Sequence, residues 1–76
     1  MESNELMEYA WSWQTCEDNR GRTILEVCWR RRSADDVARF VKAYKRGNDC
    51  ELEFIDVAAN GMRSFWEVRY NEDEED

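Results

Sequence analysis

Three cysteines and eighteen acidic residues are the side chains with the most reactive chemistry in this chain of 76 residues, which contains no histidine. Without histidine, the Ser-His and Cys-His pairs of nucleophilic catalysis cannot form. The cysteines, at positions 16, 28 and 50, lack the spacing of a zinc site. Arg30 lies two residues after Cys28, and its positive charge could lower the pKa of that thiol. A reactive Cys28 is therefore the alternative. The pattern favours reduced, unreactive thiols.

The acidic residues could supply the carboxylate pair of a glycosidase or the oxygen ligands of a cation. Nothing in their spacing distinguishes one pair from the others. The acidic run 72–76 lacks the glycine-containing loop of a calcium site, and the three glycines are too scattered to bind a phosphate. We therefore expect no enzymatic activity, no metal and no other cofactor.

Charge is unevenly distributed along the chain. Residues 1–19 hold five acids and no bases, residues 20–47 hold nine bases and three acids, and residues 48–76 hold ten acids and two bases, which gives the net charge of −7. The basic segment 30–46, which begins with Arg30-Arg31-Arg32 directly after Trp29, could contact phosphates and stack on bases. Because the overall charge repels nucleic acid, we favour a solvated edge that pairs with the chain's own acids, and direct nucleic-acid binding is not expected.

A helix over residues 33–47 is the element most clearly predicted. Ser33 can cap its first turn, with Asp36 as the acidic member of a capping box, and Gly47 can adopt the left-handed conformation at its end. The apolar stripe follows the i, i+3, i+4, i+7 spacing at Val37, Phe40, Val41 and Tyr44. A helix this short must bury that stripe against another element.

Two strand pairs supply the other layer. Residues 7–16 and 22–31 alternate apolar and polar side chains around a turn at 17–21, and we expect Trp13 opposite Leu25, with a shift of two positions left open. Residues 50–58 and 62–71 form the second pair around a three-residue loop, 59–61. That loop length places Cys50, Leu52 and Phe54 opposite Tyr70, Val68 and Trp66.

The fold class predicted from this order is α+β: a two-layer ββαββ domain in which one helix packs on a four-stranded, mainly antiparallel sheet. The helix should cover Trp11, Trp13, Val27, Phe54 and Trp66. One domain spans 1–76, with a frayed N-terminus at 1–6 and a disordered acidic tail at 72–76. We expect a cytoplasmic protein, since no apolar run approaches a membrane span and the acidic start does not suit a signal peptide.

The sheet face away from the helix is the expected working surface. Its apolar residues are Ile24, Cys28, Ile55, Val57 and Phe65, set among charged side chains. Such a patch is typical of a protein-binding or homodimer surface, although scattered exposed apolar residues are also common. The acids could imitate a nucleic-acid backbone or could serve solubility alone.

The layout resembles that of small phage-encoded proteins, including anti-CRISPR proteins and inhibitors of host polymerase or restriction. The likeness lies in a strand-strand-helix-strand-strand chain of fewer than 80 residues, the helix start Ser33-Ala34-Asp35-Asp36 and the acidic tail. It implies a non-enzymatic inhibitor in the host cytoplasm that covers a nucleoprotein defence complex. The predicted partner-binding residues are Glu51, Glu53, Ile55, Phe65, Glu67, Glu72, Asp73 and Glu74. The alternatives are a small nucleic-acid-binding or transcription-regulating domain that uses segment 30–46, and a homodimeric adaptor module.

Overall fold

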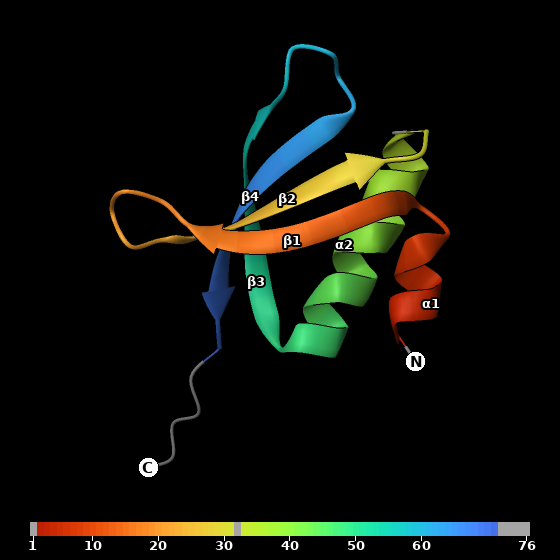
Figure 1. Cartoon of the computed structure of the whole chain (residues 1–76). Helices are drawn as coiled ribbons and strands as arrows, with labels where there is room; N and C mark the ends of the chain where they lie inside the picture. The colour runs from red at the N-terminus through yellow and green to blue at the C-terminus, as the bar shows by residue number, and fades with distance from the viewer. Residues whose placement is uncertain (1, 32, 72–76) are drawn as a thin grey trace.

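The computed structural model describes residues 2–31 and 33–71, with side chains from Glu5 onward (Figure 1). Its elements are α1 (Glu2–Met7), β1 (Ala10–Glu17), β2 (Thr23–Trp29), α2 (Ala34–Asn48), β3 (Cys50–Val57) and β4 (Arg63–Tyr70). The strands form one sheet in the order β1-β2-β4-β3, and all three pairings are antiparallel. The α+β prediction, with a helix packed on a four-stranded antiparallel sheet, is confirmed.

The second hairpin has the predicted register over most of its length. Cys50 lies opposite Tyr70, Leu52 opposite Val68 and Phe54 opposite Trp66. A bulge at Ile55 then shifts the pairing by one residue, and the Ala58 N–H donates to the Arg63 carbonyl over 2.8 Å. The loop therefore holds four residues, 59–62, where three were predicted. Because the bulge absorbs the extra residue, the apolar pairs keep their faces.

The first hairpin has the two-position shift that the sequence left open. Trp13 lies opposite Val27 rather than Leu25, and a bulge between Ala10 and Ser12 leaves Trp11 without a cross-strand partner. Trp11 is 62% exposed. The prediction that the helix covers Trp11 was therefore wrong, because alternation cannot reveal the bulge that takes this residue out of the ladder.

Helix α2 begins as predicted and ends slightly later. The Asp36 N–H donates to the Ser33 hydroxyl over 3.1 Å at the start. At the end Asp49, with φ of 53°, holds the left-handed position that was predicted for Gly47. The buried residues of the helix are Asp36, Phe40, Ala43 and Tyr44. Compared with the predicted stripe, the buried face is rotated by roughly 60°, at 3.6 residues per turn.

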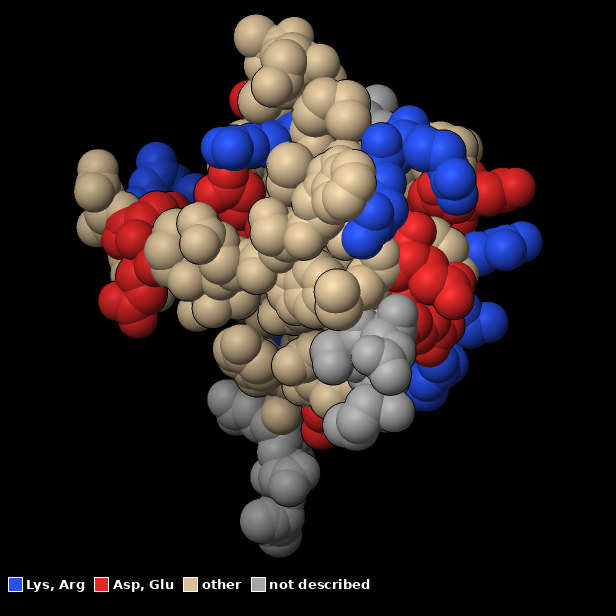
Figure 2. Space-filling view, turned by 45° about the vertical axis from the view of Figure 1, so that its right-hand side comes forward, with Lys and Arg blue, Asp and Glu red and all other residues tan. Residues whose placement is uncertain are grey.

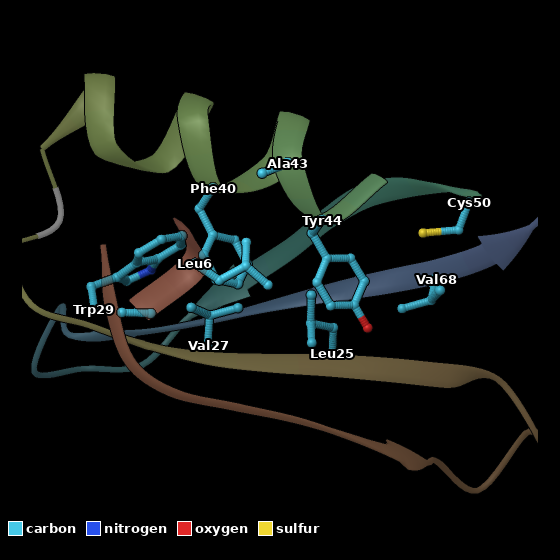
Figure 3. Packing of buried hydrophobic residues seen from close by; sticks show 10 residues of the cluster. Leu6, Leu25, Val27, Trp29, Phe40, Ala43, Tyr44, Cys50 and Val68 are labelled. Carbon is cyan, nitrogen blue, oxygen red and sulfur yellow. The ribbon is translucent and has the colours of Figure 1, made fainter. Parts of the chain in front are cut away.

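Helix α1 is the cause of that rotation. Residues 1–6 were expected to be frayed, and the first strand to start at Met7, but Glu2–Met7 is helical and packs beside α2. Leu6 is only 4% exposed and belongs to the same core as Ala43 and Phe40 (Figure 3). Since α1 covers one side of α2, the apolar residues on the other side of α2, Val37 and Val41, are only half-buried.

Candidate protein-binding site

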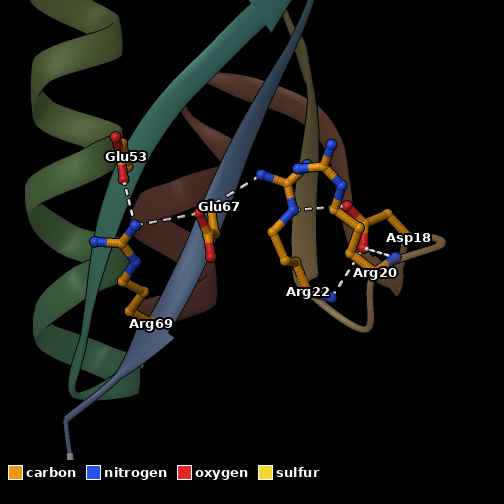
Figure 4. Close-up of polar contacts among 6 residues, drawn as sticks. All are labelled: Asp18, Arg20, Arg22, Glu53, Glu67 and Arg69. Atoms are coloured by element: carbon orange, nitrogen blue, oxygen red, sulfur yellow. Dashed lines mark hydrogen bonds and ion pairs between the residues drawn. The ribbon is translucent and has the colours of Figure 1, made fainter.

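Three of the acids predicted to bind a partner, Glu51, Glu53 and Glu67, are paired within the chain, and Figure 4 shows the contacts of Glu53 and Glu67. The Glu53 carboxylate lies 2.8 Å from the Arg69 guanidinium, and Glu67 lies 3.4 Å from the same group. Glu51 lies 3.2 Å from the ammonium group of Lys45. These contacts offset part of the local negative charge, although the Glu51 and Glu53 side chains remain 64% and 61% exposed, so the outer sheet face imitates a nucleic-acid backbone less well than unpaired carboxylates would.

The ion pairs continue toward the β1–β2 turn. Arg22 lies 3.9 Å from Glu67 and donates to Asp18 over 2.7 Å. Asp18 also accepts hydrogen bonds from the backbone N–H groups of Arg20 and Arg22. Partial desolvation raises the pKa of Asp18, but the hydrogen bonds from Arg22 and Arg20 outweigh it and bring the pKa below its ordinary value. These bonds fix the conformation of the turn and supply the Asp18 carboxylate with hydrogen-bond donors.

The predicted apolar patch of the outer face is not a continuous exposed surface. Ile55 is 41% exposed in its bulge, but Phe65 and Cys28 are half-buried and Ile24 is buried. Val57 lies opposite Ser64, which belongs to the helix-covered face, so its predicted place on the outer face was wrong. The bulge at Ile55 is the reason, since one extra residue moves the following side chain to the other face.

A small polar hollow of about 220 Å³ lies on this face, lined by Ser12, Gln14, Glu26, Cys28 and Arg63. Its charged groups already contact each other, because Arg63 donates to Glu26 over 3.1 Å and Gln14 to the same carboxylate over 3.3 Å. The remaining predicted site residues, Glu72, Asp73 and Glu74, lie outside the described residues.

The start of the basic segment is also engaged. The Arg30 guanidinium stacks 3.9 Å from the centre of the Trp11 ring and donates to the Met7 carbonyl over 2.7 Å. Arg31 lies 3.3 Å from Asp36, and Arg32 lies outside the described residues. Arg30 and Arg31 thus have partners within the chain, whereas Arg39 and Lys42 of the same segment are exposed, so the nucleic-acid alternative is weakened only at the start of the segment.

The cysteines are unpaired and differ in environment. Cys16 is exposed, Cys28 is half-buried and Cys50 is buried. Burial, with Glu51 nearby, raises the pKa of the Cys50 thiol, so it stays protonated near neutral pH. Among residues 2–31 and 33–71, no group of three Cys, Asp or Glu side chains is placed to hold a metal ion.

An apolar groove beside α2 is the surface best suited to bind a partner. It is open, has a volume of about 490 Å³, and is lined by Ala34, Val37, Ala38, Val41 and Trp66. Phe54, which is 51% exposed, packs edge-on against Trp66 with ring centres 5.3 Å apart. The small alanines allow a neighbouring backbone to come close, while the valines and the indole supply apolar area.

Trp66 contributes one further feature to the groove. Its Nε1–H is buried and has no hydrogen-bond acceptor among the described residues. A buried indole N–H usually finds an acceptor, as Trp29 does by donating to the Ser64 hydroxyl over 2.8 Å. The unpaired Nε1–H of Trp66 therefore carries a desolvation cost in the folded chain.

The sequence prediction missed this groove, although one signal for it was present. Val37 and Val41 belong to the predicted apolar stripe, and Ala34 and Ala38 flank them. The missing information was that α1 would cover the other side of α2. Had the helical Leu6 been recognised, the stripe would have appeared too wide for one buried contact.

Neither helix in the described part of the chain is long and apolar enough to cross a membrane. No protein-family model, curated protein or solved structure matches this chain.

Proposed function

We propose that this chain is a non-catalytic binding protein that takes an amphipathic helix of a basic partner protein into the groove beside α2. The observation that carries the proposal is the apolar lining of the groove, from Val37, Val41 and Trp66, left open in an otherwise charged chain. An amphipathic helix binds such grooves through apolar side chains spaced three and four residues apart. The net charge of −7 favours the approach of a basic partner.

The partner class we propose is a host nucleoprotein complex, which the chain would inhibit by covering a functional surface. Proteins that handle nucleic acid carry basic surfaces, and these suit a chain of this charge. The ion pairs of Glu51, Glu53 and Glu67 favour the groove over the carboxylates as the proposed contact surface. The carboxylates then serve mainly to accelerate association, as rim charges commonly do.

The test compares two substitutions on neighbouring helix positions. Ala38 is exposed within the groove, so Ala38→Arg fills the groove with a long, charged side chain while keeping a good helix former. Arg39 is exposed too but does not line the groove, and Arg39→Ala is the matched control. Tagged versions of both variants and of the unchanged chain are first used to capture a binding protein from host-cell lysate. The captured protein is then purified, and its affinity for each of the three chains is measured.

We expect the unchanged chain and Arg39→Ala to bind the same basic protein, and Ala38→Arg to lose at least roughly tenfold in affinity, since a charge would be buried in an apolar contact. The indole N–H resonance of Trp66 should shift when the partner binds. Equal affinity for Ala38→Arg, with no change at Trp66, would show that the groove is not the binding site. A strong loss in Glu51→Gln and Glu53→Gln alone would favour the acidic surface instead.

A further inference from the structure

Strand β1 forms an open edge of the sheet, and apart from Glu17 at its end it lacks the charges that usually protect an edge. Residues 9–16 are the longest run without Asp, Glu, Lys or Arg in the chain, of which 38% is charged. β1 spans most of this run and pairs only with β2. In Figure 2, with the α1 side turned forward, uncharged side chains form a band through the centre of the view. Exposed, uncharged edges readily pair with another strand.

The backbone groups of this edge can be assigned from the hydrogen-bond pattern. The Asp18 N–H donates to the Arg22 carbonyl over 3.0 Å, in register with the β1–β2 ladder. Because hydrogen-bonded and non-hydrogen-bonded pairs alternate in an antiparallel ladder, Gln14 and Cys16 direct their backbone groups toward β2. Trp13, Thr15 and Glu17 consequently direct theirs to the open edge.

We propose that β1 pairs antiparallel with β1 of a second copy of this chain, which makes one continuous sheet across a homodimer. The two-fold axis passes beside Gln14, so that Gln14 faces its own symmetry mate and Trp13 faces Thr15 of the other copy. Trp13 and Thr15 then exchange backbone hydrogen bonds on both sides of the axis. The Gln14 amide carries both donors and an acceptor, so two such side chains can bond to each other.

Charge complementarity selects a second copy as the partner. The proposed register places Glu17 of one copy at the bulge of the other, where Arg30 stacks on the exposed Trp11 ring. The contact with Met7 holds Arg30 in that position before association. The exposed part of the Trp11 ring adds apolar area to the interface, which backbone pairing alone lacks.

The other open edge suits self-association poorly. β3 carries Glu51, Glu53 and Asp56 along its length. Pairing β3 with a second β3 would bring these acids near one another, and like charges on adjacent strands are destabilising. We therefore place the proposed homodimer contact at the β1 edge rather than at the β3 edge.

The test uses the outward N–H of Thr15. Thr15→Pro removes this donor but no donor of the β1–β2 ladder, and proline is tolerated on edge strands where the N–H faces solvent. Thr15→Val keeps the donor and the branched shape and is the control. In sedimentation equilibrium, we expect a concentration-dependent dimer for the unchanged chain and Thr15→Val, and dimerisation at least about tenfold weaker for Thr15→Pro.

A second measurement covers the case in which the proline disturbs the monomer. In a Cys16→Ser background, Gln14→Cys places a thiol at the axis, where facing Cα atoms about 4.5 Å apart suit a disulfide. Asn19→Cys, in the exposed turn, is the control thiol. Mild oxidation should yield disulfide-linked dimers faster with Gln14→Cys than with Asn19→Cys. A monomer at concentrations up to about 500 µM, or equal cross-linking of the two thiols, would overturn the proposal.

Discussion

Phe40 is the residue around which the aromatic core is arranged. It is fully buried, and its ring meets Trp29 edge-on at 5.1 Å, Trp13 edge-on at 5.7 Å and Tyr44 in a stack at 6.0 Å between ring centres. Trp29 is held in turn by its hydrogen bond to Ser64, which lies on β4. One helix residue therefore ties α2 to strands of both hairpins.

Tyr44 should make stability depend on alkaline pH. Burial, with Tyr70 and Cys50 nearby, raises its pKa from 10.0 to about 12. The folded state thus holds this proton more tightly than the unfolded chain, so the contribution to stability is complete below the unfolded pKa and is lost as pH rises from about 10 toward 12. Over this window, we predict that the unchanged chain loses on the order of 2 kcal/mol more unfolding free energy than Tyr44→Phe.

Urea denaturation of both proteins between about pH 9 and pH 12 measures this difference. Contributions from groups far from Tyr44 are the same in the two proteins and cancel in the comparison. Parallel pH profiles would mean that the Tyr44 hydroxyl is no more desolvated in the folded state than in the unfolded chain.

At the scale of elements, the sequence was most informative where the apolar–polar alternation of two strands determines how they pair. The facing pairs of β3 and β4 could be predicted because Leu52 with Val68 and Phe54 with Trp66 are the pairs that keep apolar residues together. The bulges at Trp11 and Ile55 could not be predicted, because one inserted residue changes the strand pairing without changing the apolar–polar alternation on either side of it.

The candidate site was less predictable than the fold. Periodicity identified Val37 and Val41 as apolar stripe residues, but their exposure depends on where α1 packs. Likewise, Glu53 and Glu67 were correctly expected on the outer face, yet their pairing with Arg69 depends on side-chain geometry across two strands. Such contacts join residues far apart in sequence, and local patterns do not encode them.

Helix α1 should contribute measurably to stability despite its length of six residues. Leu6 is 4% exposed, and truncating a buried leucine removes transfer free energy and leaves a cavity. We predict that Leu6→Ala lowers the free energy of unfolding by roughly 2–3 kcal/mol, which is a large share of the total unfolding free energy of a small domain. Met7→Ala is the control, since Met7 is 49% exposed and should change stability by less than about 0.5 kcal/mol.

Chemical denaturation of the two variants and the unchanged chain gives both values. An equal, small effect of Leu6→Ala and Met7→Ala would contradict the packing of α1 on the core. It would also remove the explanation for the rotated buried face of α2, and with it the reason that the groove is open.

At the scale of the whole molecule, ion pairs join the basic middle segment of the sequence to the acidic segments before and after it. The basic end of α2 contacts the acidic segments on both sides, since Arg46 lies 3.7 Å from Glu5 and Lys45 lies 3.2 Å from Glu51. In the part of the chain that the structure describes, two surfaces without such pairing are the groove beside α2 and the β1 edge. The groove adjoins β4, whereas β1 is separated from β4 by β2.

This separation predicts that the two surfaces act independently. Ala38→Arg should close the groove and leave self-association unchanged, because α2 does not border the β1 edge in the proposed dimer. Thr15→Pro should give a monomer that still binds an apolar fluorescent dye in the groove. Dye titration and sedimentation equilibrium on both variants measure the two properties separately. If Ala38→Arg also abolished the dimer, the groove itself would be the self-association surface, and the placement of the two-fold axis beside Gln14 would be wrong.

With independent surfaces, each dimer presents two open grooves, so a partner that carries several copies of its binding helix should be held more tightly by the dimer than by the Thr15→Pro monomer.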